Sequence, residues 1–339
     1  MILRGTVLLT VLLSILGLVG STAFGQQEEM RYFAPGVLTV IKPDSLEEEA
    51  STGPIPLVEI LTDYANLDWK PNYTAKKETL LDRGKAVTLR RPIWTLEFAF
   101  KPVRRIYVDI PQTTGRMQRK YLWYMVYRVK NLGSQLTPVA KTDDFGNVTY
   151  EVQPGAAPEL RFAPHFVFAG KAFIDDQYVE KEYLDRALPI AAKAIEERES
   201  RDPQTGKRVK LYSTVEITKV AIPASDENVD RSVWGYVVWE DVDPRIDFFR
   251  IYVQGLTNAY RMADLPAPDG YEKGQPPASG RAFAMKTLQL NFWRAGDSIA
   301  EHEEEVHYGI RLESDPLEQA EIYAHYGIQE PLDHVWVYR

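Results

Sequence analysis

The sequence predicts a mainly β protein: two immunoglobulin-like β-sandwich regions, a short connecting helix and an irregular, proline-rich N-terminal arm. Aromatic and β-branched residues dominate most of the apolar runs, as is typical of strands. These runs either alternate between apolar and polar residues or are apolar on both faces. Helical spacing is kept over only one region, and turn-forming residues separate the other runs.

Residues 232–260 form the densest apolar window, SVWGYVVWEDVDPRIDFFRIYVQGLTNAY. Its two aromatic runs, 233–239 and 246–253, are apolar on both faces, which predicts strands that are covered on both sides. The intervening residues 240–245 are acidic, and Pro244 favours an extended or turn conformation before it. We therefore predict that this window forms a hairpin within one sheet.

The first 25 residues have the layout of a secretory signal peptide. Arg4 precedes the apolar stretch 6–20, and the small residues Ala23 and Gly25 precede the expected cleavage site. The alternative is an uncleaved anchor, although this apolar stretch is short for a membrane span. No later stretch reaches membrane-spanning length, so the mature protein is predicted to be exported to the periplasm or the extracellular space, with no membrane span.

Composition and missing motifs restrict the function classes. The net charge is −8 and no basic patch is evident, which argues against nucleic acid as a partner. Cysteine is absent, which excludes disulfides, thiolate metal sites and cysteine nucleophiles. The chain also lacks a G-x-G dinucleotide fingerprint, a G-x-S-x-G nucleophile elbow and a P-loop.

The first half of the chain divides into the arm, residues 26–90, and the first β region, residues 91–200. Repeated prolines punctuate the arm, where 36–41 could form a strand and 56–61 a strand or a helical turn. A hairpin turn is expected at 143–147. The strands expected in the first β region are 94–100, with one wet face, and 103–110, 121–129, 148–152 and 165–168.

Residues 174–200 are the one region with helical spacing, an apolar stripe at Leu184, Leu188, Ala191 and Ile195. Pro189 should break it, so the better-supported helix covers 189–199. The polar stretch 200–207 is the expected domain boundary. The second β region, 208–339, has expected strands at 209–222, 281–293, 306–312 and 335–338, and a proline- and glycine-rich loop at 266–280.

Two segments carry a resemblance to other proteins. They are YLDRALPI at 183–190, with Arg198 and Glu199 following, and WEDVDPRIDFF at 239–249, continuing as YVQGLTN at 252–258. Both resemble segments of a group of uncharacterised secreted bacterial proteins of unknown function. The resemblance implies an exported β-rich protein, and it implies no activity or site.

Histidines concentrate near the C-terminus and are candidate metal ligands, for zinc above all: His302, His307, His325 and His334. The segment HEEEVH at 302–307 superficially resembles a zincin motif. Histidines five positions apart, however, stand about 140° apart around a helix and do not share a face. Surface or packing roles are the alternative.

A second candidate site is the acidic loop formed by Glu240, Asp241, Asp243 and Asp247. Clustered carboxylates can bind calcium, and paired carboxylates can hydrolyse glycosides. The order of the residues lacks the calcium-loop pattern, so a solvated turn is the alternative.

Aromatic side chains are a third candidate, because an exposed row of them would form a stacking platform for sugars or proteins. Buried, they would instead form the core. The candidates are Trp123, Trp234, Trp239 and Trp293, together with Tyr124, Tyr127 and Tyr236.

From these observations the sequence predicts an exported, non-catalytic binding or structural protein of the bacterial cell envelope. Its partner would be an envelope protein or a polysaccharide, and no cofactor is expected. The alternatives are a metal-dependent hydrolase that uses the C-terminal histidines, with zinc or calcium, and a carbohydrate-binding module.

Overall fold

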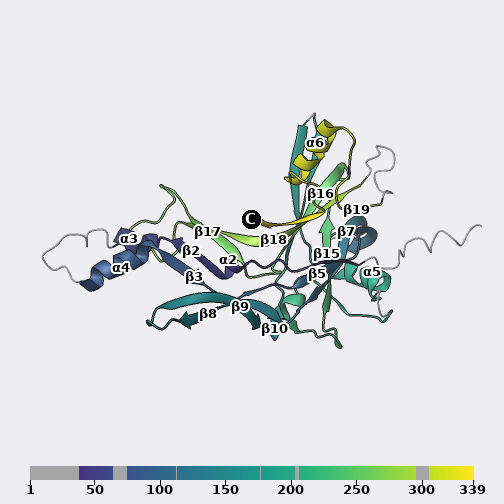
Figure 1. Cartoon of the computed structure of the whole chain (residues 1–339). Helices are drawn as coiled ribbons and strands as arrows, with labels where there is room; N and C mark the ends of the chain where they lie inside the picture. The colour runs from purple at the N-terminus through teal and green to yellow at the C-terminus, as the bar shows by residue number, and fades with distance from the viewer. Residues whose placement is uncertain (1–37, 64–74, 112, 176, 203–205, 295–304) are drawn as a thin grey trace, which may run out of the picture.

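The computed structural model describes residues 38–63, 75–111, 113–175, 177–202, 206–294 and 305–339 (Figure 1). The predicted signal segment lies outside these residues. The protein is mainly β, and its two large sheets pack as a sandwich. Within the described residues, no helix has the length and the apolar character needed to cross a membrane.

Sheet A has the strand order β1-β5-β7-β15-β13, and β6 also pairs with β7. Its strands are β1 (Thr39–Ile41), β5 (Glu97–Phe100), β6 (Arg104–Pro111), β7 (Met117–Lys130), β13 (Leu211–Tyr212) and β15 (Val233–Glu240). All of these pairs are antiparallel except β13 with β15.

Sheet B has the order β12-β11-β16-β18-β17, and β19 and β20 also pair with β18. Its strands are β11 (His165–Ile174), β12 (Gln177–Leu184), β16 (Ile246–Gln254), β17 (Tyr260–Asp264), β18 (Arg281–Trp293), β19 (His307–Tyr308) and β20 (His334–Tyr338). Both sheets therefore take strands from each side of the predicted boundary at 200–207, and the strands do not divide into one sandwich per region.

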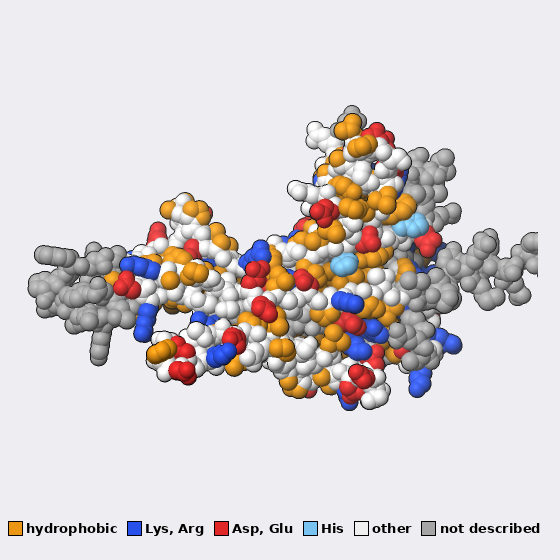
Figure 2. Space-filling model, viewed as in Figure 1, with side chains coloured by type: hydrophobic (Ala, Val, Ile, Leu, Met, Phe, Trp, Pro, Cys, Tyr) orange, Lys and Arg blue, Asp and Glu red, His pale blue; other side chains and the backbone are white. Residues whose placement is uncertain are grey.

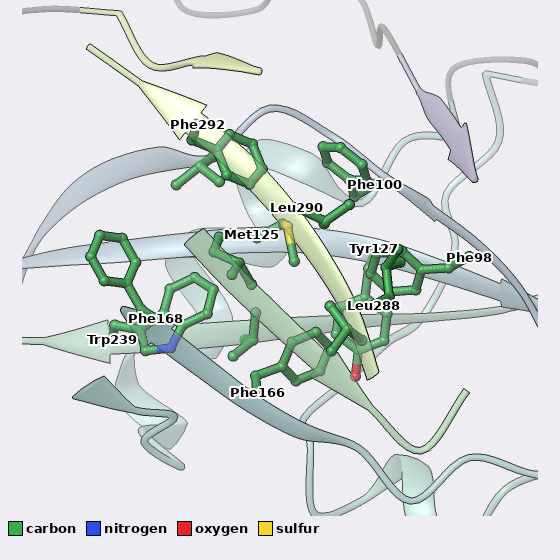
Figure 3. Close-up of a cluster of buried hydrophobic side chains, with 14 of the residues drawn as sticks. Phe98, Phe100, Met125, Tyr127, Phe166, Phe168, Trp239, Leu288, Leu290 and Phe292 are labelled. Atoms are coloured by element: carbon green, nitrogen blue, oxygen red, sulfur yellow. The ribbon is translucent and has the colours of Figure 1, made fainter. Parts of the chain in front are cut away.

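The main core lies between the two sheets and is rich in aromatic rings (Figure 3). Phe98 and Tyr127 of sheet A both contact Phe166 of sheet B, with ring centroids 6.4 and 4.9 Å apart. Trp123 meets Phe168 edge-on at 5.5 Å. Offset and edge-on ring contacts of this kind add stability beyond the apolar area that they bury.

The central window forms the two predicted strands, β15 and β16, but the predicted hairpin is wrong. β15 pairs with β7 in sheet A, whereas β16 pairs with β11 and β18 in sheet B. The acidic segment 240–245 is therefore a crossover between the sheets, and we call it the crossover loop. β15 lies between the sandwich core and α5, whereas β16 faces the core on one side and is partly covered by α6 on the other.

One helix covers the outer face of sheet A. α5 (Pro189–Glu199) has Pro189 in its first turn, as predicted, and buries Ala191 and Ile195 against Tyr124 and Tyr236. The earlier part of the predicted helical region, 174–188, is not helical, because it contains strand β12, which pairs with β11 along its whole length. The pattern that resembled a helical stripe there belongs to an edge strand.

Several predicted strands are shorter or more covered than expected. Residues 209–222 contain only β13, the 3₁₀ turn η3 (Ile217–Lys219) and the start of β14 (Ala221–Pro223). β14 pairs with β10 (Glu159–Arg161). The wet face predicted at 94–100 is largely covered, since Thr95 and Ala99 are buried.

Two β ribbons and two helices extend from one end of the sandwich (Figure 1). The longer ribbon is the hairpin of β8 (Ser134–Thr142) and β9 (Val148–Ala156), joined to β4 (Ile93–Trp94). Its predicted turn forms, and the Asp143 carboxylate accepts hydrogen bonds from the backbone of Phe145 and Asn147. The other elements are β2 (Ser51–Ile55), β3 (Val87–Arg90), α3 (Val58–Asp63) and α4 (Ala75–Lys85).

The described part of the N-terminal arm is joined to the sandwich. β1 pairs with β5 at the edge of sheet A, and the short α2 (Glu47–Ala50) buries the Glu49 carboxylate. Lys286 of β18 donates to that carboxylate at 2.6 Å and to the Asp44 carbonyl at 2.6 Å. This buried ion pair holds the described part of the arm against sheet B.

Helix α6 (Pro316–Tyr326) was not predicted from the sequence, although its ends carry ordinary signals. The Asp315 carboxylate accepts from the backbone N–H of Leu317 at 2.9 Å, and Pro316 occupies the first turn. Gly327 ends the helix in the left-handed conformation. α6 packs on β16, beside the β11–β12 hairpin.

Candidate functional site

The crossover loop borders an open depression of about 570 Å³ at the side of the sandwich, where β12 ends. Its lining residues are Lys181, Tyr183, Asp241, Val242, Asp243, Pro244 and Arg245. Asp241 adopts a positive φ of 56°, which turns the chain from sheet A towards sheet B. The depression thus lies where the edge of sheet B meets the crossover, and two of the four predicted acidic residues, Asp241 and Asp243, line it.

Asp243 is the most constrained of these carboxylates, with its side chain 6% exposed. Arg245 binds it through two guanidinium nitrogens, at 3.0 and 2.8 Å, and Lys181 donates to it at 2.7 Å. The hydrogen bonds from Arg245, followed by those from Lys181, hold the pKa of Asp243 well below its usual value. A carboxylate held in this way stays ionised and serves poorly as a general acid or base.

The other two carboxylates of the crossover loop, Glu240 and Asp241, are paired with a cation from sheet A. Lys120 of β7 makes ion pairs with Glu240 and Asp241, and its hydrogen bond to Glu240 is the chief reason that its pKa is raised. Arg186 lies 3.6 Å from Glu240. Because each acidic group already has a basic partner, a calcium ion here would have to compete with ammonium and guanidinium groups.

Asp247, the fourth predicted acidic residue, does not line this depression. It lies on β16, where its carboxylate is 3.6 Å from the guanidinium of Arg294. The arrangement at the crossover is therefore an ionic clamp between the sheets, made by Lys120, Lys181 and Arg245 with the three loop carboxylates.

The described histidines occupy separate environments. His307 stacks on Trp293 at a centroid distance of 4.4 Å, and Nδ1 of His334 lies 3.1 Å from the Tyr308 hydroxyl. His325 is buried on α6, whereas His302 lies outside the described residues. Over the described part of the chain, no three histidine or acidic side chains gather as a metal site.

Most of the predicted aromatic candidates are core residues. Trp123, Trp234 and Trp239 are 2%, 4% and 0% exposed, so they cannot form a surface platform. Tyr124, Tyr127 and Tyr236 are buried as well. Trp293 is half-buried under His307. The burial follows from the position of β7 and β15 in the middle of sheet A, with the second sheet on one face and α5 on the other.

One buried charge cluster was missed by sequence reasoning. The Glu199 carboxylate, at the end of α5, binds Arg104 at 2.7 Å, Tyr124 at 3.1 Å and Lys101 at 3.3 Å. Lys101 also donates to the Glu199 carbonyl at 2.6 Å. This cluster joins α5 to sheet A, and the hydrophobic pattern of the chain gives no signal for it.

One stretch of the sequence is locally basic. Residues 101–120 contain six Lys or Arg and one acidic residue, Asp109. Arg104 and Arg105 lie on β6 and Arg119 and Lys120 on β7, and three basic residues of the stretch are paired with acids: Lys101 and Arg104 with Glu199, and Lys120 with Glu240.

Comparison of the chain with protein-family models, with curated proteins and with solved structures gave no match.

Proposed function

We propose that the chain is an exported, non-catalytic binding or structural protein of the bacterial cell envelope, acting in the periplasm or outside the cell after removal of residues 1–25. The signal-like N-terminus supports the location. The immunoglobulin-like character of the sandwich remains a prediction. The binding role rests on one observation, the exposed apolar end of the β8–β9 hairpin.

That hairpin presents large apolar side chains to solvent at its free end, in the lower left of the view (Figure 2). Phe145 in the turn is 91% exposed, and Val148 and Tyr150 on β9 are 54% and 44% exposed. Isolated apolar residues on a surface are common, but several of them along one projecting element are typical of an interaction site.

The register of the β8–β9 hairpin places its exposed apolar side chains on one face and the Lys141–Glu151 ion pair on the other. Tyr150 opposes Ala140 and Val148 opposes Thr142, so these pairs share one face. Lys141 and Glu151, which are bound to each other at 2.8 Å, belong to the opposite face. β9 is also the last strand of its three-stranded sheet. An apolar face beside a terminal strand fits an envelope protein better than a hydrated glycan.

The crossover depression supports a non-catalytic role for the proposed function. Its two carboxylates, Asp241 and Asp243, are bound by lysine and arginine side chains, and the low pKa of Asp243 keeps that group ionised. These interactions connect β7, β12 and the crossover loop, so they are suited to hold the two sheets together.

The test combines cell fractionation with crosslinking in the native host. A photo-reactive amino acid replaces Phe145, and in a matched variant it replaces Phe283, which is 52% exposed on β18. We expect a protein that begins near Gln26 in the envelope fraction, with one discrete crosslinked partner from position 145. Val148→Asp should abolish that crosslink without lowering the thermal midpoint, since Val148 is exposed.

Recovery of the uncleaved chain in the cytoplasm would contradict the location. Equal crosslinking from positions 145 and 283, unaffected by Val148→Asp, would contradict the binding role of the hairpin.

A further inference from the structure

The outer edge of β9 is a strand edge with few charges beside it. β9 is the last strand of its sheet, and its nine residues include one charged side chain, Glu151. Two other long edge strands carry three charged side chains each: Arg104, Arg105 and Asp109 on β6, and Glu180, Lys181 and Glu182 on β12. Charged side chains protect an exposed edge against pairing with another strand. Of these three edges, that of β9 is therefore the least protected.

The backbone groups of β9 point alternately towards β8 and towards the outer edge. At the hairpin turn, the N–H of Asp143 donates to the carbonyl of Asn147. Opposite residues of an antiparallel pair alternate between bonded and unbonded pairs. The register therefore turns the N–H and C=O groups of Val148, Tyr150 and Val152 outward. Over the described residues, these outward groups make no backbone hydrogen bond.

The sequence of this edge is self-complementary. In antiparallel pairing of β9 with β9 of a second copy, about a two-fold axis at Tyr150, each Val148 opposes Val152 of the other chain. The three pairs use all of the outward groups and form about six backbone hydrogen bonds, two for each pair. On the opposite face, Thr149 opposes Glu151 of the second copy, which keeps the ion pair of its own hairpin. No like charges stand opposite each other.

The neighbouring registers are less favourable. An axis at Glu151 sets two carboxylates directly opposite each other and brings Pro154, which lacks an N–H, into a bonded pair. An axis at Thr149 extends the pairing onto Gly146, which belongs to the hairpin turn and not to the strand. The sequence therefore favours the axis at Tyr150.

The side chains along this edge are accessible. Val148 is 54% exposed, and Tyr150 is 44% exposed although the Arg90 guanidinium lies 3.8 Å from its ring. That contact is made to the ring and not to the outward backbone groups. Val152, on the same face, packs against the small core of Ala50, Ile93 and Ala259. A second copy would continue this apolar face across the axis and cover it further.

We propose that β9 pairs with β9 of a second copy of this chain, so that two β8–β9 hairpins join their sheets about a two-fold axis at Tyr150. A closed two-fold interface uses the same surface on both chains and leaves neither of these edges unpaired. The inference rests on the proposed function, because it names the protein that the hairpin binds. A monomeric chain whose hairpin crosslinks a different envelope protein in the host would support the proposed function and overturn this partner.

Because the chain has no cysteine, introduced thiols can locate the axis. In Tyr150→Cys the two thiols stand opposite each other, with about 5.5 Å between the Cα atoms of a bonded pair, a separation that a disulfide spans. We expect a covalent dimer after mild oxidation of the purified full chain. Thr149→Cys and Glu151→Cys are the matched controls. Their equivalent residues are diagonal neighbours about 7–8 Å apart, so they should form far less of this dimer.

Sedimentation equilibrium measures the association without any introduced thiol. The parent chain should be a dimer. Val148→Asp places a carboxylate opposite Val152 at two symmetric positions and should weaken self-association at least about tenfold. The matched control is Val179→Asp, at a residue that is 42% exposed on β12, and it should associate like the parent chain. Thermal midpoints of all variants verify folding.

Three results would overturn the proposal: a monomeric parent chain, self-association that survives Val148→Asp, or equal weakening by Val148→Asp and Val179→Asp. Disulfides that form in Thr149→Cys or Glu151→Cys but not in Tyr150→Cys would contradict the axis at Tyr150.

Discussion

Tyr124 and Tyr127 show how buried polar groups differ at the scale of single residues. They stand on the same strand, β7, but face opposite layers, and both are 1% exposed or less. The Tyr124 hydroxyl donates to the Glu199 carboxylate at 3.1 Å, below α5. The Tyr127 hydroxyl lies in the sandwich core with no hydrogen-bond partner among the described residues. Burial raises the pKa of both phenols, so both stay protonated at neutral pH.

Removing each hydroxyl should therefore have a different effect on the free energy of unfolding. Tyr124→Phe should cost about 1.5–3 kcal/mol, because it removes a hydrogen bond to a buried charge. Tyr127→Phe should cost nothing or stabilise by up to about 1 kcal/mol, because it removes an unsatisfied buried hydroxyl. Urea unfolding of the two variants measures both values, and equal destabilisation would contradict the difference between the two environments.

The ion pairs of Asp243 in the crossover loop should make the stability of the protein sensitive to low pH. The pKa of Asp243 is lowered in the folded state from its usual 3.8, chiefly by Arg245 and then by Lys181. The unfolded chain therefore binds a proton at a pH where the folded chain does not, and stability rises with pH across that window. The contribution of the Asp243 charge to the free energy of unfolding is fully present above pH ~4, near the pKa of the unfolded chain. It is lost as the pH falls further, towards the lower pKa of the folded state.

Asp243→Asn should lower the thermal midpoint at pH 7, and the difference from the parent chain should shrink at pH 3. Thermal unfolding at the two pH values measures this. Asp241→Asn is the control, since Asp241 is largely exposed beside Lys120 and should have a much smaller effect. A constant difference at both pH values would show that Asp243 acts through something other than its charge.

Helix α6 depends on a buried histidine. The His325 ring stacks on Phe248 of β16 at 5.0 Å and meets Tyr178 of β12 edge-on at 4.7 Å. Burial lowers its pKa from the usual 6.5, and so do Lys171 and Arg250 of the strands below, against the opposing effect of Glu321 on the same helix. Unfolding then takes up a proton below pH 6.5, so the stability from this docking is present above that pH and declines as pH falls.

His325→Phe should keep the packing and reduce the loss of stability between pH 7.5 and pH 5.5. Thermal midpoints at the two values measure the effect, with His165→Asn, at an exposed histidine of β11, as the control for removing one histidine. If the parent chain and His325→Phe lose the same stability on acidification, His325 does not couple α6 to pH.

Elements defined by local pattern were predictable from the sequence. Strands β7, β15, β16, β18 and β20 follow from aromatic and β-branched runs, and α5 from the position of Pro189. Pairing was not predictable, because a short polar segment joins two strands equally well as a hairpin or as a crossover. The helix α6 was missed although Asp315 and Gly327 mark its ends, and its exposed Leu317 obscures the apolar stripe.

The candidate site was predictable in its acidic residues and not in their partners. Lys120 and Lys181, which bind the crossover carboxylates, come from strands far away in the sequence. The burial of Trp123, Trp234 and Trp239 was not predictable either, because the elements that cover them are also distant in the sequence. Whether an aromatic strand is exposed depends on which sheet and which helix cover it, and this is decided by long-range packing rather than by the strand itself.

At the scale of the whole molecule, the topology joins the two halves of the chain. β15, from the second half, is the neighbour of β7 in sheet A, and β16 is the neighbour of β11 in sheet B. Side chains from both halves form one core cluster. Separation at the predicted boundary would leave β7 and β11 with unpaired edges and would expose one side of the core in each half.

We therefore expect fragments 38–202 and 206–339 to be unfolded or aggregated when they are produced separately, and the full chain to unfold in one cooperative transition. Circular dichroism and thermal melting of each fragment test the first point. Agreement of the calorimetric and van't Hoff enthalpies for the full chain tests the second. Mixing the fragments should restore β structure, since each supplies the strands that the other lacks. Two fragments that melt independently and cooperatively would instead support two separate sandwiches, because only a self-contained core gives a sharp transition on its own.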